Sequence, residues 1–170
     1  MYFYRKITDG VDFNNVIFQY FNFNRQKVTG IELETKITPV KGFTIAGNYT
    51  YIHPSEQSQS RITFKDSTYD YLIKRPGNSL NITAGYQCGN GLYVSVSGKY
   101  AGTHYDVGGY QEADVLLKSY LILGAYAQYE LNKSLKLFLN MQNITGKKFF
   151  DIRGYNSIPF MINGGATFYW

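Results

Sequence analysis

The sequence predicts an all-β protein, built as an antiparallel, up-and-down sheet of about eight strands. Apolar and polar side chains alternate over many stretches, which is the pattern of a strand with one apolar and one polar face. Tyr, Phe and Gly number 17, 12 and 17 among 170 residues, and charged residues make up only 17%. This composition favours strands over helices. The connections between the predicted strands alternate between long and short, so neighbouring strands are expected to pair as hairpins.

The strand boundaries follow from the alternation and from turn residues. The strands are expected over residues 1–9, 17–37, 43–52, 80–87, 92–100, 120–131, 135–143 and 160–170. Short turns are predicted at residues 39–42, 88–91 and 132–134, where Gly, Pro or Asn interrupts the pattern. The longer, polar connections are expected around Asp9-Gly10 and Asn14-Asn15, and at residues 54–71, 102–114 and 146–159. All short turns therefore fall at one end of the sheet, as in transmembrane β-barrels with short periplasmic turns and long extracellular loops.

The last predicted strand has the most regular alternation. From Phe160 to Trp170, one face carries Phe, Ile, Gly, Ala, Phe and Trp, and the other carries Met, Asn, Gly, Thr and Tyr. Its eleven residues match the roughly 9–11 that a tilted strand needs to cross a bilayer. The mean hydropathy of −0.28 does not argue against a membrane, because barrel strands carry polar residues on one face.

The alternation alone allows the apolar face to meet either lipid or a soluble core. Two observations favour lipid. The opposite face repeatedly carries charged or amide side chains, such as Glu32, Asn81, Lys99 and Gln128, which suits a wet lumen. Aromatic residues also cluster near strand ends, where rings prefer the membrane interface. The predicted membrane-interface residues are Tyr49, Tyr51, Tyr86, Tyr100, Phe168 and Trp170. A soluble ligand-binding barrel remains the alternative.

No catalytic motif is present, and we expect neither an enzyme nor a cofactor. His53 and His104 could serve a metal or hydrolase site with nearby Glu56 and Asp106, but exposed histidines at the rim are the simpler interpretation.

Calcium binding and nucleic-acid binding have little support as well. Asp66, Asp70 and Asp106 lack the spacing of a dedicated calcium loop. The net charge of +5 comes from scattered residues, so no nucleic-acid site is predicted. Cys88 is the one cysteine, which excludes an internal disulfide.

Several stretches, taken in order, resemble TonB-dependent outer-membrane receptors, in particular vitamin B12 and siderophore receptors. They read YFYRKITDGVDF, NRQKVTGIELE, IAGNYTYI, LIKRPGNSLNITAGY and SGKYAGTHYD, followed by QNITGKKFFD and a final strand that ends on an aromatic residue. The resemblance covers essentially the whole chain. It implies that residues 1–170 form the C-terminal part of such a barrel, with the plug domain, the earlier strands and a signal peptide lying upstream.

The resemblance also implies a function and partners. A corrinoid or a ferric siderophore would bind at the extracellular loops of an outer-membrane transporter in a Gram-negative bacterium. The TonB system would act through the upstream plug, and outer-membrane lipid would surround the barrel. The barrel-assembly machinery would read the C-terminal strand, with Phe168 and Trp170 as its aromatic residues. The alternative function is a self-contained eight-stranded outer-membrane barrel with a structural or adhesive role, since eight strands can close by themselves.

Overall fold

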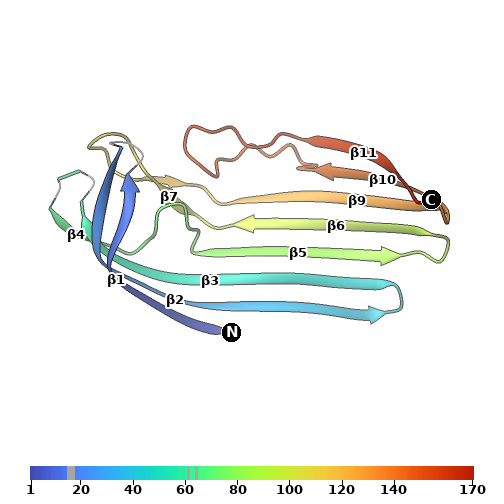
Figure 1. Ribbon diagram of the computed structural model, residues 1–170, viewed down its shortest axis with the longest axis horizontal. Helices are drawn as coiled ribbons and strands as arrows, with labels where there is room; N and C mark the ends of the chain where they lie inside the picture. The colour runs from blue at the N-terminus through green and yellow to red at the C-terminus, as the bar shows by residue number, and fades with distance from the viewer. Residues whose placement is uncertain (15–17, 61, 64) are drawn as a thin grey trace.

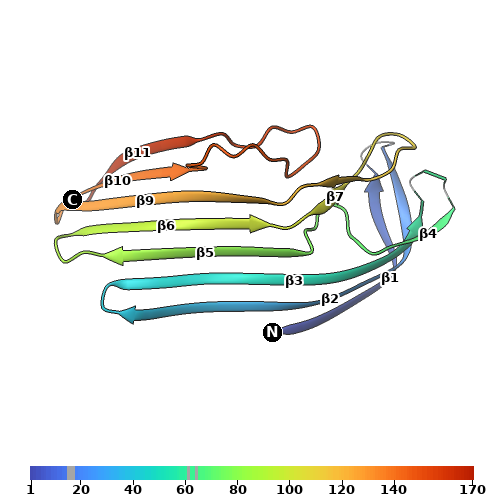
Figure 2. The same ribbon diagram turned by 180° about the vertical axis from the view of Figure 1, so that it is seen from behind.

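The computed structural model describes residues 1–14, 18–60, 62–63 and 65–170. Their regular structure consists of strands (Figures 1 and 2). The strands are β1 (Tyr2–Asn14), β2 (Gln19–Val40), β3 (Phe43–Gln59), β4 (Asp66–Tyr69), β5 (Asn78–Gln87), β6 (Leu92–Ala101), β7 (His104–Asp106), β8 (Val115–Leu117), β9 (Tyr120–Asn132), β10 (Leu135–Gln142) and β11 (Met161–Phe168). No helix in this part of the chain is long and apolar enough to span a membrane.

Eight of the described strands form one antiparallel path in the order β1-β2-β3-β5-β6-β9-β10-β11. The strands of this path follow one another in chain order, and each pairs antiparallel with the next strand of the path. The predicted up-and-down topology is therefore confirmed. The short β4 pairs with β3, and β7 pairs with β8 in a separate two-stranded sheet. Figure 1 shows the turns that follow β2, β5 and β9 at one end of the sheet and the longer connections at the other. Gly42 and Gly91 support two of these turns, with φ values of 83° and 82° that favour glycine.

The first hairpin differs from the prediction. Asp9-Gly10, expected as a turn, lies inside β1, where Asp9 has a φ of 53° and Gly10 pairs with Phe23. Cross-strand pairing continues on both sides of this position, so the strand carries on past the local turn signal. Of the other predicted boundaries, Asn15 and Ile17 lie outside the described residues. The structure begins β2 at Gln19.

Other boundaries were wrong in the polar segments. Residues 54–71 were expected as a loop, yet β3 continues to Gln59 and then pairs with β4. The stretch 102–114 contains β7, which was also expected to be loop. The final strand, β11, has eight residues rather than eleven. Its pairing is extended by one bond, from Tyr169 N–H to the Ser134 carbonyl at 2.9 Å.

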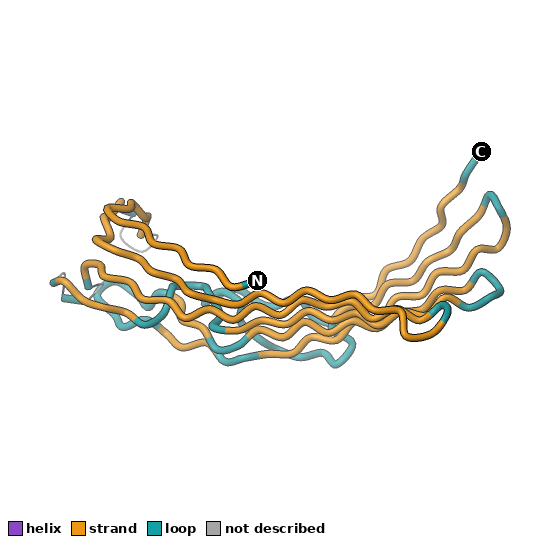
Figure 3. Tube along the Cα trace, turned by 90° about the horizontal axis from the view of Figure 1, so that it is seen from below, coloured by secondary structure: helices purple, strands orange, loops and turns teal. Residues whose placement is uncertain are grey.

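The sheet is open. β1 and β11 stand at the two ends of the strand order, and the described pairings include none between them. Figure 3 shows a curved, open layer in which the chain termini lie apart. A self-contained, closed eight-stranded barrel is therefore not what the structure shows. Closure requires a hydrogen-bonded partner for both edge strands, and neither edge provides it for the other.

The two faces of the sheet differ in chemistry. On what we call the polar face, register places Asn48, Asn81 and Lys99 side by side on three strands, and Asn81 Nδ2 donates to Asn48 Oδ1 at 2.9 Å. The opposite face, the apolar face, carries side chains that stay largely exposed, including Leu33 at 58% and Val96 at 59%.

The buried hydrophobic side chains of the described residues are few and do not form a core across the sheet. They are Val28, Leu72, Ala101, Leu117 and Tyr120. They belong to the part of the molecule that holds the long connections. A wide exposed apolar band with little core beneath it is expected where lipid covers the surface.

Candidate functional site

Three long connections come together at the end of the sheet opposite to the short turns. We refer to them by the strands that they join: the β3–β5 connection (residues 60–77), the β6–β9 connection (102–119) and the β10–β11 connection (143–160). They are tied to one another by specific contacts, described below. This matters for function because binding residues are often carried on loops that a rigid scaffold positions.

The β3–β5 connection is attached to the β6–β9 connection. The Tyr71 ring stacks on the Tyr105 ring, with centroids 3.8 Å apart and an interplanar angle of 18°. The Tyr71 hydroxyl donates to Asp114 Oδ2 at 2.8 Å, and the Lys74 amide donates to the Tyr105 carbonyl at 2.7 Å. Stacking and hydrogen bonds thus restrain the two segments relative to each other.

The β10–β11 connection is attached to the β6–β9 connection through two aspartates. Asp106 is 1% exposed, and its Oδ2 accepts a hydrogen bond from the Arg153 amide at 2.6 Å. Asp151 Oδ1 accepts from the Tyr120 hydroxyl at 2.7 Å. The His104 ring adds a further link, with Nε2 3.1 Å from the Asp151 carbonyl oxygen. Hydrogen bonds to carboxylates are among the stronger ones, so this attachment should be firm.

Asn143 fixes the start of the β10–β11 connection. Its side chain is 1% exposed, donates to the carbonyls of Lys147 and Ile158, and accepts from the Lys147 amide, all at 2.9 Å. Its φ of 48° lies in the left-handed region, which Asn tolerates better than most residues. The bond to Ile158 brings the far end of the connection back to its beginning.

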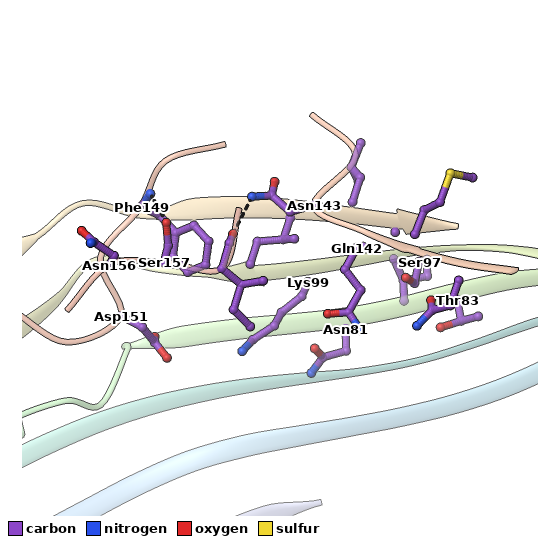
Figure 4. Close-up of a pocket in the computed structure, with 18 of the residues that line it drawn as sticks. Asn81, Thr83, Ser97, Lys99, Gln142, Asn143, Phe149, Asp151, Asn156 and Ser157 are labelled. Atoms are coloured by element: carbon purple, nitrogen blue, oxygen red, sulfur yellow. Dashed lines mark hydrogen bonds between the residues drawn. The ribbon is translucent and has the colours of Figure 1, made fainter. Parts of the chain in front are cut away.

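Because the connection folds back in this way, it forms one wall of an open pocket of about 630 Å³ on the polar face. Figure 4 shows Asn81, Thr83 and Lys99 rising from the sheet, with Phe149, Asp151 and Asn156 coming from the connection. The volume lies within the range of small-molecule sites, about 300–1,000 Å³. Amide, hydroxyl, aromatic and charged groups converge there, so the pocket can hydrogen-bond a polar ligand, stack on its rings and pair with its charges. We take it as the candidate ligand-binding site.

The histidine hypotheses are not supported. His53 is exposed on β3, as expected, but His104 is buried in β7 at 3% exposure, so the expectation of an exposed histidine was wrong there. Asp106 is occupied by backbone amides of Val107 and Arg153. Within the described ranges, no three His, Cys, Asp or Glu side chains come together as a possible metal site.

The predicted interface residues share the apolar face. Register sets Tyr49 and Tyr100 on either side of Leu80, and it places Tyr86 opposite Phe43 beside a short turn. Tyr51, Tyr86, Phe168 and Trp170 are exposed at 42%, 44%, 67% and 111%. Their contact with the membrane interface remains a prediction.

Sequence reasoning missed the residues that build the pocket. Asn143 and Asp151 lie in the tail stretch that carries the family resemblance, yet alternation assigns them no role. Tyr120 was counted as the start of a strand, and its hydroxyl bond to Asp151 spans 31 residues. A spacing pattern cannot reveal a contact of that kind.

Comparison with known proteins identifies the family. The family model described as "TonB dependent receptor-like, beta-barrel" matches residues 2–144.

Solved structures share the fold. The ferric-catecholate import receptor Fiu from Escherichia coli K12 has a TM-score of 0.73 and 17% identity, over 98% of this chain and 24% of that one. The pyoverdine outer-membrane receptor FpvA from Pseudomonas aeruginosa PAO1 has a TM-score of 0.76 and 14% identity, over 99% and 26%. The FrpB iron transporter from Neisseria meningitidis has a TM-score of 0.74 and 15% identity, over 98% and 28%.

The chain thus spans about a quarter of the length of these structures. At these identities the likeness to them concerns the fold alone, whereas the family match covers most of the chain. The chain belongs to the TonB-dependent receptor-like β-barrel family of the Gram-negative outer membrane.

Proposed function

We propose that residues 1–170 are the C-terminal barrel part of a TonB-dependent outer-membrane transporter that takes up a ferric siderophore. The observation that carries the proposal is the pocket of about 630 Å³ between the β10–β11 connection and the polar face. It combines the Lys99 ammonium, hydroxyl and amide donors, and the aromatic rings of Phe149 and Tyr155. A corrinoid is the alternative ligand.

The chemistry of the pocket suits a ferric siderophore. Ferric complexes of catecholates expose oxygen atoms, carry negative charge and present flat rings. A lysine can pair with the charge, side-chain amides can donate to the oxygens, and aromatic rings can stack on the ligand. The names of two similar proteins, a ferric-catecholate import receptor and a pyoverdine receptor, point in the same direction.

The remaining parts of the mechanism belong to partners. The polar face would line the lumen of the complete barrel, and the long connections would face the outside. Energy coupling would come from the TonB system through a plug domain upstream of this chain. The aromatic residues of the apolar face would sit at the two membrane interfaces, and the barrel-assembly machinery would recognise the C-terminal strand through Phe168 and Trp170.

Replacing Phe168 and Trp170 with Ser should lower the amount of receptor in the outer membrane.

Uptake in cells tests the proposal. A strain that depends on the complete receptor is given ⁵⁵Fe-labelled siderophores or ⁵⁷Co-labelled cyanocobalamin, with and without functional TonB. We expect TonB-dependent accumulation of iron. Accumulation of cobalt would replace the siderophore by a corrinoid, and accumulation of neither would refute the transport proposal.

Two variants test whether the ligand binds in the pocket. Tyr155→Ala and Lys99→Ala should each weaken binding of the siderophore at least several-fold at equal receptor levels. Lys36→Ala is the matched control, because Lys36 is an exposed lysine of the polar face on β2 and does not line the pocket. Equal losses in all three variants would argue against the pocket as the binding site.

A further inference from the structure

His104 is a buried, titratable side chain to which the proposed function gives no role. It lies in β7, is 3% exposed, and is not among the residues that line the pocket. Each ring nitrogen has a carbonyl oxygen within hydrogen-bond distance: Nδ1 lies 3.2 Å from the Gly102 oxygen, and Nε2 lies 3.1 Å from the Asp151 oxygen. The first contact is local, whereas the second joins the β6–β9 connection to the β10–β11 connection.

Two carbonyl oxygens around one imidazole ring favour its protonated form. A neutral ring has one N–H that donates and one bare nitrogen that only accepts, whereas the imidazolium ion donates from both nitrogens. A carbonyl oxygen can only accept. In the neutral ring, one of the two contacts therefore sets a nitrogen lone pair against an oxygen lone pair. Because His104 is 3% exposed, little water can replace the lost bond.

The surroundings of the ring do not oppose a positive charge. Leu117, the register partner of His104 in β8, is apolar and 7% exposed. The ionisable side chains at this junction are Asp106, Glu112, Asp114 and Lys118 of the β6–β9 connection, Asp151 and Arg153 of the β10–β11 connection, Lys74 of the β3–β5 connection, and Tyr120 at the start of β9. This set holds more carboxylates than cationic side chains, so an imidazolium ion would not meet an excess of positive charge.

Asp151 connects the state of the ring to the pocket. It lines the pocket together with Phe149 (Figure 4). Its carboxylate accepts a hydrogen bond from the Tyr120 hydroxyl at 2.7 Å, and its carbonyl oxygen lies beside the His104 ring. Histidine ordinarily changes charge between about pH 5 and 8, whereas aspartate and tyrosine ordinarily do so outside this range. Of the two links, the one to His104 should therefore respond to pH near neutrality.

We propose that His104 is a positioning residue, and that its protonated ring is a pH-sensitive link that holds the β10–β11 connection, one wall of the pocket, against the β6–β9 connection. Both bonds are present while the ring is protonated, and one is lost as the pH rises through the range in which histidine deprotonates. The wall is therefore firmer in mild acid than in mild alkali. This inference goes beyond the proposed function, because it depends on the pocket wall and not on the identity of the ligand.

Hydrogen–deuterium exchange of the complete receptor, without ligand, tests the proposal. Exchange across residues 149–155 is followed at about pH 5.5, 7 and 8.5, which span the range of histidine, and each rate is divided by the intrinsic chemical rate at that pH. The variant is His104→Gln, whose side-chain amide can donate to a carbonyl but does not titrate in this range. The matched control is His53→Gln, because His53 is an exposed histidine on β3.

We expect the corrected exchange of residues 149–155 in the original protein to become roughly tenfold faster between the lowest and the highest pH, because a hydrogen bond from a charged group is lost. His53→Gln should show the same profile. His104→Gln should show a flat profile, whatever its level of protection.

A flat profile in the original protein would overturn the proposal, and this outcome does not depend on whether a variant folds. An equally steep profile in His104→Gln would also overturn it, because another group would then be titrating. TonB-dependent uptake is measured separately. Its absence would refute the transport proposal and leave these exchange profiles unchanged.

Discussion

Asn143 offers the sharpest test of how the pocket is held together. Replacing it with Ala removes three buried hydrogen bonds, to the carbonyls of Lys147 and Ile158 and from the Lys147 amide. At about 1 kcal/mol each, these bonds contribute about 3 kcal/mol. Ala also pays about 1 kcal/mol to adopt the positive φ at this position, 48°. The β10–β11 connection should therefore lose about 4 kcal/mol of local stability.

Hydrogen–deuterium exchange of the complete receptor measures this loss. A change of 4 kcal/mol in the opening free energy predicts roughly 10³-fold faster exchange across residues 147–158. Asn143→Gly removes the same bonds but accommodates the positive φ, so its exchange should be only about 10²-fold faster. The difference between the two variants isolates the cost of the backbone conformation.

Asn156→Ala is the control, because Asn156 is exposed in the same connection. It should leave exchange unchanged. If the exchange of residues 147–158 in Asn143→Ala stayed within twofold of the original protein, the connection would be held by something other than this side chain, and the argument would be wrong.

Two further predictions concern the sheet. Val96→Arg should cost about 2–4 kcal/mol of barrel stability, measured by denaturant unfolding in lipid, because Val96 lies mid-strand on the apolar face. Ser97→Arg, on the polar face, should cost far less. The reverse order of the two losses would mean that the faces are assigned wrongly. Gly30→Ala should reduce the yield of folded receptor, because its Cβ would lie 2.5 Å from the Tyr51 carbonyl oxygen, whereas Gly98→Ala meets its nearest atom at 3.4 Å and should be tolerated. Equal yields of the two alanine variants would refute the steric reasoning.

The sheet could be predicted from the sequence because its signal is local. A period of two needs only neighbouring residues, and Gly91 beside Asn90 marks a turn without reference to the rest of the chain. The prediction failed where this signal ends. Past Pro54, β3 is polar on both faces, so no alternation marks the strand, although its backbone continues to pair with β2 as far as Ser58.

The pocket could not be predicted, because the contacts that form it are distant in sequence. The Arg153 amide reaches Asp106 across 47 residues, and Tyr71 reaches Asp114 across 43. Neither aspartate is distinguishable from a solvated loop carboxylate until the strands have brought the connections together. The resemblance indicated which family the tail belongs to, but it gave no reason to single out Asn143 within it.

The two ends of the sheet are therefore built by different physical means. At the short turns, connections of two or four residues hold neighbouring strands together, and no further packing is required. At the opposite end, the connections are long enough to bury polar groups, and buried polar groups must be paired. Asp106 and Asn143, each 1% exposed, meet this requirement by binding backbone groups of the β10–β11 connection. The bonds that satisfy these side chains also shape the pocket, so ligand binding and the stability of the connection should change together.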